Sequence, residues 1–317
     1  MSGAERNKSP EPGRASLRAV RRIVVATDLS APAERALAWA EDLAQRHGAA
    51  ILLVHSVIPP DSFGAAVEMP LGLGDQLLTS AREKLEELAA EVAARGHETE
   101  TLVGFGRPEN FIDDICHQQG ADLCVIGTRG LRGFRHLLLG STAQRVLRRA
   151  CCPVLSVHEA DSGGSGAVKR VLIPTDFSPD AETAIEDALT VFSLAGDGAT
   201  IFLLHALQLP TEYGVYGTQG MSEMSLRYWE ALASSFEDRL RGIAATLEKR
   251  GLTVETRVAR GYAPEAILAA AQELEVDLVA LGTRGRAGLG RLVLGSTAER
   301  VVQCAPCPVL TSHAPAQ

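Results

Sequence analysis

The sequence contains no long hydrophobic run, and this excludes a membrane-spanning helix. The longest apolar runs, such as residues 51–54 and 201–204, are short, whereas a spanning helix needs about 20 consecutive apolar residues. The N-terminal stretch is rich in Pro, Gly, Ser and charged residues and lacks the apolar core of a signal peptide. We therefore expect a cytoplasmic protein with a disordered leader at residues 1–20.

An excess of positive charge is also missing. The 317 residues include 31 Lys and Arg against 39 Asp and Glu, and the formal net charge is -8. Affinity for nucleic-acid phosphates comes mostly from clustered Lys and Arg. The composition therefore argues against a nucleic-acid binder with a broad basic surface, and a basic patch must have a local role.

The six cysteines do not form the pattern of a secreted disulfide scaffold. With 46% hydrophobic residues, a chain of this length can build a core without cross-links, so we expect reduced thiols that are mostly small core residues. Cys304 and Cys307 form a CxxC motif, but no second CxxC and no His pair with ligand spacing accompanies it. A buried thiol is therefore preferred there over a redox or zinc site.

The chain repeats itself after 155 residues, the offset between Gly127 and Gly282. IGTRGLRGFRHLLLGSTAQRV at 126–146 returns as LGTRGRAGLGRLVLGSTAERV at 281–301, and the flanking strands return as well. Two copies of one domain joined by a Gly/Ser-rich linker are the direct interpretation. The expected units are a leader at 1–20, a domain at 21–159, a linker at 160–168 and a domain at 169–314.

Each copy alternates short β-branched runs with longer amphipathic segments. In the first copy the expected strands are RIVVAT, ILLVHSV, ETETLVGF, DLCVIG and PVLSV, and the expected helices span 33–46, 76–95, 109–119 and 142–149. Near-continuous apolar strands that alternate with helices indicate a parallel sheet covered on both faces. We therefore expect an α/β fold with two tandem open parallel-sheet domains of five strands each.

A glycine-rich segment between the fourth strand and the next helix is the best candidate for a binding site. The pattern G-x2-G-x9-G-[ST] occurs in both copies, each time after an apolar strand and before a helix start. It matches neither the P-loop nor the G-x-G-x-x-G fingerprint. Its residues are Gly127, Gly130, Gly140 and Ser141 in the first copy and Gly282, Gly285, Gly295 and Ser296 in the second.

The helix after each segment offers a site for an anion. The sequences Ser-Thr-Ala-Gln and Ser-Thr-Ala-Glu after Gly140 and Gly295 fit a capping box, which predicts helices that begin at Thr142 and Thr297. Free N–H groups and the helix dipole favour a phosphate at such an end. The preceding glycine lets a ligand approach the backbone without meeting a Cβ.

Charged side chains complete the candidate site. Arg129 and Arg284 stand between the first two glycines and can supply positive charge near a phosphate. Asp28 and Asp176 follow the first strands and would face the glycine segment if strands one and four are neighbours. Such a carboxylate can hold a ribose hydroxyl, an exocyclic amine or a metal ion. The residues alone leave two interpretations open, phosphate or nucleotide binding and a tight loop with incidental arginines.

Two histidines end the second strands near this candidate site. His55 and His205 occupy equivalent positions in the two copies. They could contact a ligand, or they could be structural residues that hydrogen-bond within the protein. The structural interpretation is preferred.

At these residues the chain resembles the universal stress protein family in its tandem form. In that family G-x2-G-x9-G-[ST] marks members that bind ATP, so the resemblance implies ATP or another adenine nucleotide in each copy, alone or with Mg²⁺. It also implies a Rossmann-like strand order of 3-2-1-4-5 and an intramolecular pseudo-dimer paired through the fifth strands. By the family's pattern, Asp28 and Asp176 contact the nucleoside. Ser56 and Ala206 take the adenine-lining position, where valine is frequent.

Three functional hypotheses remain open. The first is a stress-response regulator in which nucleotide occupancy controls conformation, oligomerisation or the binding of unidentified protein partners, including a homodimer of pseudo-dimers. The second is a slow ATPase or autophosphorylating protein that uses Asp28, Asp176 and a bound metal. Because no acid/base group beyond that Asp is found, no catalytic residue and no metal ligand is assigned. The third is a nucleotide-independent scaffold.

Overall fold

The computed structural model describes most of the chain. It covers residues 19–58, 72–128, 139–158, 161, 168–195, 198–208, 223–285 and 294–314, with the backbone alone at 223–226. The expected leader up to residue 18, most of the expected linker, and Arg129 and Gly130 lie outside the described residues.

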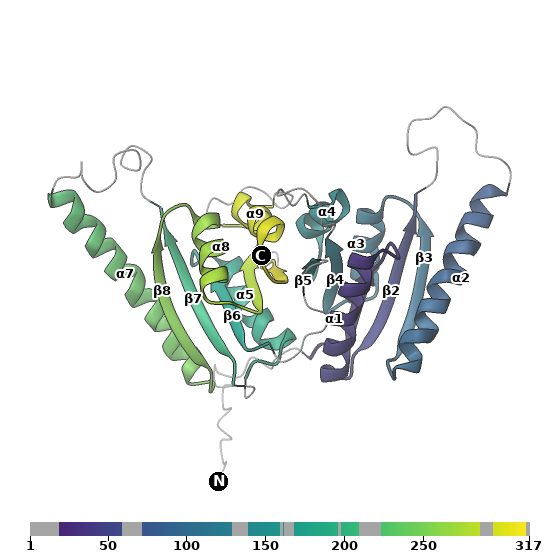
Figure 1. Cartoon of the computed structure of the whole chain (residues 1–317), viewed down its shortest axis with the longest axis horizontal. Helices are drawn as coiled ribbons and strands as arrows, with labels where there is room; N and C mark the ends of the chain where they lie inside the picture. The colour runs from purple at the N-terminus through teal and green to yellow at the C-terminus, as the bar shows by residue number, and fades with distance from the viewer. Residues whose placement is uncertain are drawn as a thin grey trace, which may run out of the picture.

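Both halves contain strands that alternate with helices, as the sequence pattern predicts (Figure 1). The first half consists of β1 Arg22–Ala26, α1 Ala31–His47, β2 Ala50–Val57, α2 Leu73–Ala94, β3 Thr99–Phe105, α3 Pro108–Gln118, β4 Leu123–Thr128, α4 Ser141–Arg149 and β5 Val154–His158. The second half consists of β6 Arg170–Pro174, α5 Pro179–Val191, β7 Thr200–Leu207, α7 Glu223–Glu248, β8 Thr253–Arg260, α8 Ala263–Glu273, β9 Leu278–Gly282, α9 Ser296–Cys304 and β10 Val309–Ser312.

The strands form one continuous sheet. Its order is β3-β2-β1-β4-β5-β10-β9-β6-β7-β8, so each half has the expected order 3-2-1-4-5. Neighbouring strands are parallel within each half, whereas β5 and β10 pair antiparallel with Leu155 opposite Leu310. Parallel strands need crossover connections, which the helices supply, and pairing of the fifth strands covers an edge that each half would otherwise expose. The predicted fold and the pairing through the fifth strands are confirmed.

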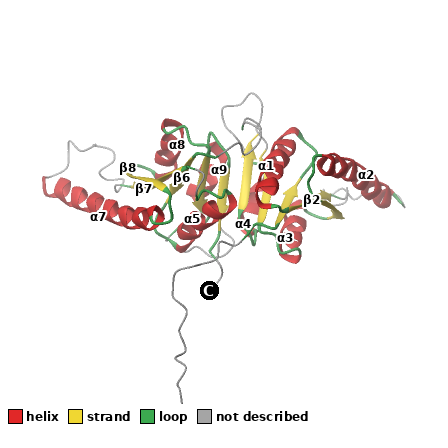
Figure 2. Ribbon diagram, turned by 90° about the horizontal axis from the view of Figure 1, so that it is seen from below, coloured by secondary structure: helices red, strands yellow, loops and turns green. Residues whose placement is uncertain are grey.

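Helices cover both faces of the sheet, as Figure 2 shows from below. Alternate residues of β1 point to opposite faces: Ile23 and Val25 belong to one buried cluster, and Val24 and Ala26 belong to the other. The first cluster contains residues of α1, α2, α5 and α7, and the second contains residues of α3, α4, α8 and α9. Both clusters include residues of both halves, so the core is continuous across the join.

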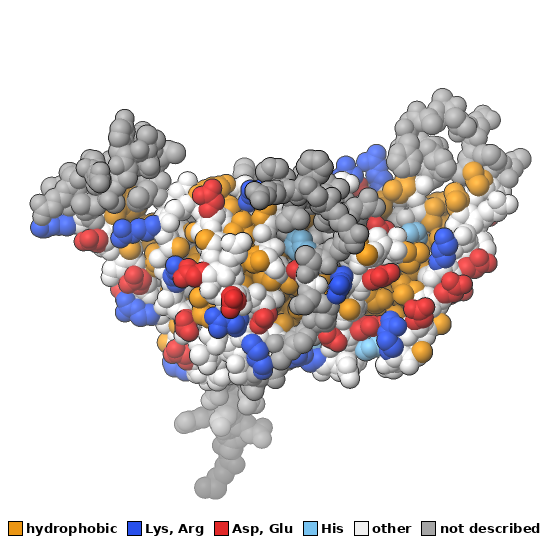
Figure 3. Space-filling view, viewed as in Figure 1, with side chains coloured by type: hydrophobic (Ala, Val, Ile, Leu, Met, Phe, Trp, Pro, Cys, Tyr) orange, Lys and Arg blue, Asp and Glu red, His pale blue; other side chains and the backbone are white. Residues whose placement is uncertain are grey.

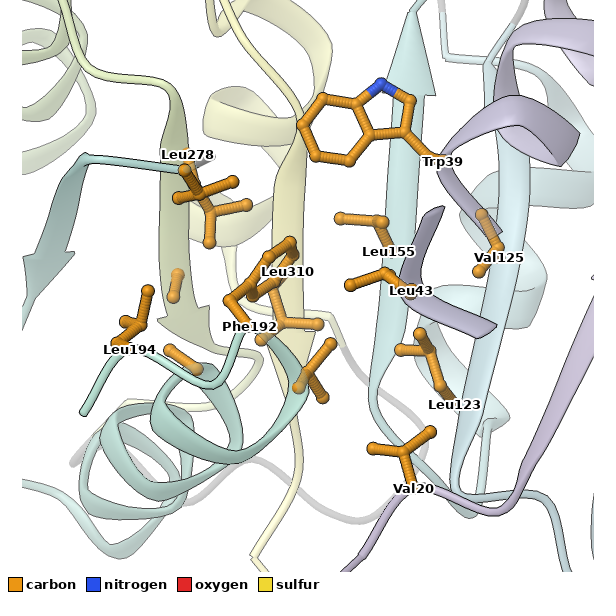
Figure 4. Close-up of a cluster of buried hydrophobic side chains, with 14 of the residues drawn as sticks. Val20, Trp39, Leu43, Leu123, Val125, Leu155, Phe192, Leu194, Leu278 and Leu310 are labelled. Atoms are coloured by element: carbon orange, nitrogen blue, oxygen red, sulfur yellow. The ribbon is translucent and has the colours of Figure 1, made fainter. Parts of the chain in front are cut away.

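Large apolar side chains fill the join between the halves. Leu155 and Leu310 lie together on the paired fifth strands, with Phe192 and Trp39 beside them (Figure 4). The rings of Trp39 and Phe192 meet edge to face, with centroids 6.4 Å apart. Such a pair adds about 1 kcal/mol beyond the burial of its area. The two halves are therefore joined by packing as well as by sheet hydrogen bonds.

Polar side chains cross the same join at equivalent positions of the repeat. His158 Nε2 lies 2.8 Å from the carbonyl oxygen of Val302, and the backbone of Leu147 is close enough to His313 to counteract in part the lowering of its pKa by burial. Each histidine thus reaches the last turn of the opposite half's α4 or α9. These two helices lie side by side near the top of Figure 1. The contacts repeat because the two halves are related by an approximate twofold axis.

Charges of both signs are interspersed on the face drawn in Figure 3. This distribution agrees with the slight excess of acidic residues and gives that face no broad basic surface for a nucleic-acid backbone. In the ranges that the structure describes, no helix is both long enough and apolar enough to cross a membrane.

Candidate functional site

Each half has a pocket at the carboxyl ends of its parallel strands. The pockets have volumes of about 320 Å³ in the first half and about 350 Å³ in the second. Each lies where the strand order reverses, because β1 pairs with both β2 and β4, and β6 pairs with both β7 and β9. Open parallel sheets bind ligands at this position. We call these cavities the first pocket and the second pocket.

Every sequence-predicted site residue that the structure describes lines one of the two pockets. In the first pocket these are Asp28, Ser56, Gly127, Gly140, Ser141 and Thr142. In the second pocket they are Asp176, Ala206, Gly282, Arg284, Gly285, Gly295, Ser296 and Thr297. The two remaining predicted residues, Arg129 and Gly130, lie outside the described ranges.

A tight turn after the first strand of each half holds the pocket's aspartate. Asp28 Oδ1 accepts hydrogen bonds from the backbone N–H and the hydroxyl of Ser30, the former at 3.1 Å. Asp176 Oδ1 accepts the equivalent N–H of Ser178 at 3.0 Å. The residue after each aspartate has a positive φ, 60° at Leu29 and 63° at Phe177. Such backbone strain persists only where the surroundings enforce it and is concentrated at functional sites.

The helices at the pockets begin one residue earlier than predicted, and the predicted capping boxes are wrong. Gly140 and Gly295 are the N-cap residues, and neither helix has a side-chain cap hydrogen bond. The side chain expected to close the first box, that of Gln144, instead donates to the carboxylate of Glu299 across the join. The first-turn N–H groups of α4 and α9 therefore receive no capping hydroxyl, and the first residues of both helices line the pockets.

The glycines of the motif have two distinct roles. A Cβ on Gly127 would lie 2.5 Å from the carbonyl oxygen of Pro32, and one on Gly282 would lie 2.7 Å from the carbonyl carbon of Asp180. These glycines allow the first turns of α1 and α5 to pack against β4 and β9. A Cβ on Gly140 would meet nothing within 4 Å, so this glycine is the one that leaves free space at the helix N-terminus.

The second pocket contains an arginine that is already paired with a carboxylate. Arg284 Nε lies 2.9 Å from Asp180 Oδ2, and Arg284 Nη2 lies 3.1 Å from Asp180 Oδ1. Asp180 also accepts the backbone N–H groups of Arg284 and Ala314, each at 3.1 Å. Burial raises the pKa of Asp180, but the hydrogen bonds from Arg284 and Ala314 outweigh it and lower the pKa below its ordinary value. The charge of Arg284 is thus largely compensated inside the protein.

The strand-two histidines hydrogen-bond within the protein, and both also line the pockets. His55 Nδ1 lies 2.8 Å from the carbonyl oxygen of Thr27, and His205 Nδ1 lies 2.8 Å from that of Thr175. Since a carbonyl oxygen only accepts, Nδ1 is the donor in both rings. Ser56 donates to the carbonyl oxygen of Gly106 at 2.9 Å, which ties the end of β2 to the end of β3.

Sequence reasoning missed the apolar wall of each pocket and one charged residue. Ile112 of α3 and Ile267 of α8 line the first and second pockets. In the sequence these isoleucines belong to the apolar stripe of an amphipathic helix. Such a stripe does not indicate which of its residues line a site. Asp180 gives no such signal, because its arginine partner lies 104 residues away in the chain.

Comparisons with known proteins agree with this architecture. A model of the universal stress protein family matches residues 19–158 and again 167–313. A universal stress protein of Mycolicibacterium smegmatis is 27% identical over 298 residues, which is 91% of this chain and 95% of that protein. One of Mycobacterium tuberculosis is 28% identical over 300 residues, which is 92% of this chain and 96% of that protein.

A solved structure shows the same fold over nearly the whole length. The crystal structure of a universal stress protein from Archaeoglobus fulgidus superimposes with a TM-score of 0.72 and covers 93% of this chain and 99% of that chain. Its sequence identity is 22%, so the likeness concerns the fold alone. The two matches of the family model cover more than half of the chain. The chain therefore belongs to the universal stress protein family, with two copies of the family's domain in one polypeptide.

Proposed function

We propose that each half binds an adenine nucleotide, with ATP as the first candidate. In this proposal, occupancy controls conformation, self-association or partner binding in a cytoplasmic stress response. One observation carries it: two pockets with the same construction lie at the strand-order reversals of the two halves. Their volumes of about 320 and 350 Å³ fall in the range of small-molecule sites.

The chemistry of each pocket suits the three parts of a nucleotide. The uncapped N-terminus of α4 or α9 offers backbone N–H groups and a positive dipole end to phosphates. Asp28 or Asp176 can accept hydrogen bonds from ribose hydroxyls. The apolar wall formed by Ile112 or Ile267 suits the adenine ring.

We propose binding with little or no turnover. Among the described residues, no group of three or more His, Cys, Asp or Glu could hold a metal ion. Mg²⁺ would therefore enter with the phosphates, which commonly supply its ligands together with one or two carboxylates. In-line hydrolysis also needs a group that orients the attacking water. The described lining of each pocket offers one aspartate for this task, the residue that follows β1 or β6.

The most direct test is to denature the purified protein and identify any released nucleotide by mass spectrometry. Calorimetric titration of nucleotide-free protein then counts the sites, and we expect two per chain. Release of no nucleotide together with no binding on titration would favour the scaffold hypothesis. Rapid conversion of bound ATP to ADP in the presence of Mg²⁺ would favour the ATPase.

A single substitution separates the two sites. Gly140→Val places its side chain in open space at the N-terminus of α4, so it should fill the first pocket without disturbing the fold. We expect the stoichiometry to fall from two to one, with the second pocket as an internal control. Gly242→Val, an equally unhindered change on the exposed surface of α7, should leave both sites intact. Two sites in the Gly140→Val protein would contradict the assigned phosphate position.

A further inference from the structure

Asp180, near the start of α5, accepts hydrogen bonds from two other segments of the second half. Its Oδ2 accepts from the hydroxyl of Thr283 at 3.3 Å, from the backbone N–H of Arg284 at 3.1 Å and from Nε of Arg284 at 2.9 Å. Its Oδ1 accepts from Nη2 of Arg284 and from the backbone N–H of Ala314, each at 3.1 Å. The side chain of Asp180 is 7% exposed. One buried carboxylate thus joins the start of a helix to the residues after β9 and the residues after β10.

The hydrogen bonds continue from these residues to the N-terminus of α9. The carbonyl oxygen of Thr283 accepts the backbone N–H of Gly295, the N-cap residue of α9, at 2.8 Å. The backbone N–H of Thr283 donates to the carbonyl oxygen of Ser312 at 3.0 Å, which fixes the same residue to β10. Asp180 therefore holds Thr283, and Thr283 holds the helix end to which the proposed function assigns the phosphates.

Asp180 also sets the orientation of the Arg284 side chain, which lines the second pocket. Asp180 and the carbonyl oxygen of Ala314 accept from Nε and Nη2 of the guanidinium. Nη1 makes no hydrogen bond with the residues that the structure describes, so its two N–H groups can donate to a ligand while the pair with Asp180 stays intact. A guanidinium that is already held in place loses little freedom when it binds a phosphate.

The first half has no carboxylate at the position of Asp180. Its equivalent is Pro32, because each residue lies four positions after the aspartate of its pocket. The contacts agree with this alignment: a Cβ on Gly127 would meet the backbone of Pro32, and a Cβ on Gly282 would meet that of Asp180. The same place in the fold therefore offers five hydrogen-bond contacts to a carboxylate in the second half and a side chain without an acceptor in the first.

The N-cap glycines of α4 and α9 differ in the same sense. A Cβ on Gly295 would lie 3.1 Å from the carbonyl oxygen of Thr283. A Cβ on Gly140 would meet nothing within 4 Å. In the described ranges, the N-cap of α9 thus has a close neighbour that Asp180 holds in place, and the N-cap of α4 does not.

We propose that Asp180 is a positioning residue of the second nucleotide site and makes this site the tighter of the two. This role rests on the proposed function, which assigns the phosphates to the N-terminus of α9. Asp180 holds Arg284 and, through Thr283, the N-cap Gly295 before a nucleotide arrives, so less freedom is lost on binding. The carboxylate repels the phosphates only weakly, because Arg284 pairs with it by two side-chain hydrogen bonds. The advantage of the second site therefore depends on the phosphates of the ligand.

Calorimetric titration of the full-length protein with ATP tests the order of the two sites. We expect two classes of site whose Kd values differ by about tenfold. Gly140→Val fills the first pocket, so the class that remains in this variant should be the tight one. Equal Kd values, or a remaining class that is the weak one, would overturn the inference and leave nucleotide binding itself in place.

Substitution of Asp180 in the Gly140→Val protein tests its role at the second pocket alone. Asp180→Ala should weaken the binding of ATP by about tenfold. The Kd for adenosine, which has no phosphate, should change by less than about twofold. Asp180→Asn keeps the shape of the side chain and removes its charge, so it should show the same selective loss even if thermal unfolding shows that the alanine variant is not folded.

Glu186, on the same helix, offers a matched control. Its carboxylate accepts two hydrogen bonds from Arg250, at 2.6 and 3.1 Å, and it does not line the second pocket. Glu186→Ala therefore removes an arginine–carboxylate pair from α5 without touching the residues after β9. We expect it to leave the Kd values for ATP and adenosine unchanged.

Three results with these variants would overturn the inference while the proposed function stands. The first is an unchanged affinity for ATP when Asp180 is replaced. The second is an equal loss for ATP and adenosine, which would indicate a merely structural role. The third is an equal loss of ATP affinity in the Glu186→Ala protein. Absence of nucleotide binding by the unmodified chain would instead overturn the proposed function, and this inference with it.

Discussion

The two halves share one backbone plan and differ at the mouths of their pockets. In the second half Asp180 lies at the start of α5 and holds Arg284 by two side-chain hydrogen bonds. The equivalent position in the first half is Pro32, which has no charge to offer. Duplicated residues that shape the backbone, such as Gly127 and Gly282, are the same in both halves, whereas Pro32 and Asp180 differ. The two pockets are therefore similar in form, but the second half has a carboxylate paired with a lining arginine at a position where the first half has a proline.

An aromatic stack marks a second difference. Phe177 stacks on Phe236 of α7, with ring centroids 5.8 Å apart, and lies 4.9 Å from the ring of His205. The guanidinium of Arg239 sits 3.8 Å above the Phe177 ring. In the first half the equivalent of Phe177 is Leu29, whose side chain is 37% exposed. The rim of the second pocket is thus tied to α7, and Leu29 makes no such stack.

The largest expected effect tests whether the backbone plan is truly shared. Gly127→Ala and Gly282→Ala each place a Cβ within 2.7 Å of the backbone of α1 or α5, which cannot move without shifting the helix. We expect each change to lower the free energy of unfolding by about 3 kcal/mol, measured by urea denaturation. Gly140→Ala is the control and should change it by less than about 0.5 kcal/mol. A large loss of stability for only one of the two substitutions would contradict a shared backbone plan.

The next effect tests the ion pair that the first half lacks. Asp180→Ala removes the partner of Arg284, and we expect it to lower the free energy of unfolding by about 2 kcal/mol. Because folding lowers the pKa of Asp180, its contribution is present above the ordinary value of 3.8 and is lost as the pH falls through the folded value. The difference between the two proteins should therefore shrink in acid. Pro32→Ala is the control, and a pH-independent difference for Asp180→Ala would rule out the ion pair as its cause.

The smallest effect concerns a histidine at the join. Burial lowers the pKa of His313, and the nearby charge of Arg284 lowers it further. The unfolded chain therefore binds the proton more readily, so stability is present above about pH 6.5 and declines as the pH falls below it. Relative to His313→Gln, the unmodified protein should lose about 1 kcal/mol between about pH 7.5 and pH 5.5. If the urea midpoints of the two proteins change in parallel over this pH range, the expectation is wrong.

Part of the site could be predicted because its signals are local. The glycine motif and the strand-end aspartates are short patterns beside periodic elements, and all of their described residues line the pockets. The same patterns could not show that Gly127 packs against α1 while Gly140 leaves open space. The predicted capping boxes are wrong for a similar reason, because the side chain of Gln144 donates a hydrogen bond to Glu299 across the join.

The order of amino acids alone was enough for the duplication, for the alternation of strands and helices, and for the position of the candidate site along the chain. Hydrophobic period and turn chemistry act over a few residues, so they are visible without a fold. The Asp180–Arg284 pair and the Gln144–Glu299 contact join residues that are far apart in the chain. Only the packing of the helices against the assembled sheet brings such side chains into contact, because it converts separation along the chain into proximity in space.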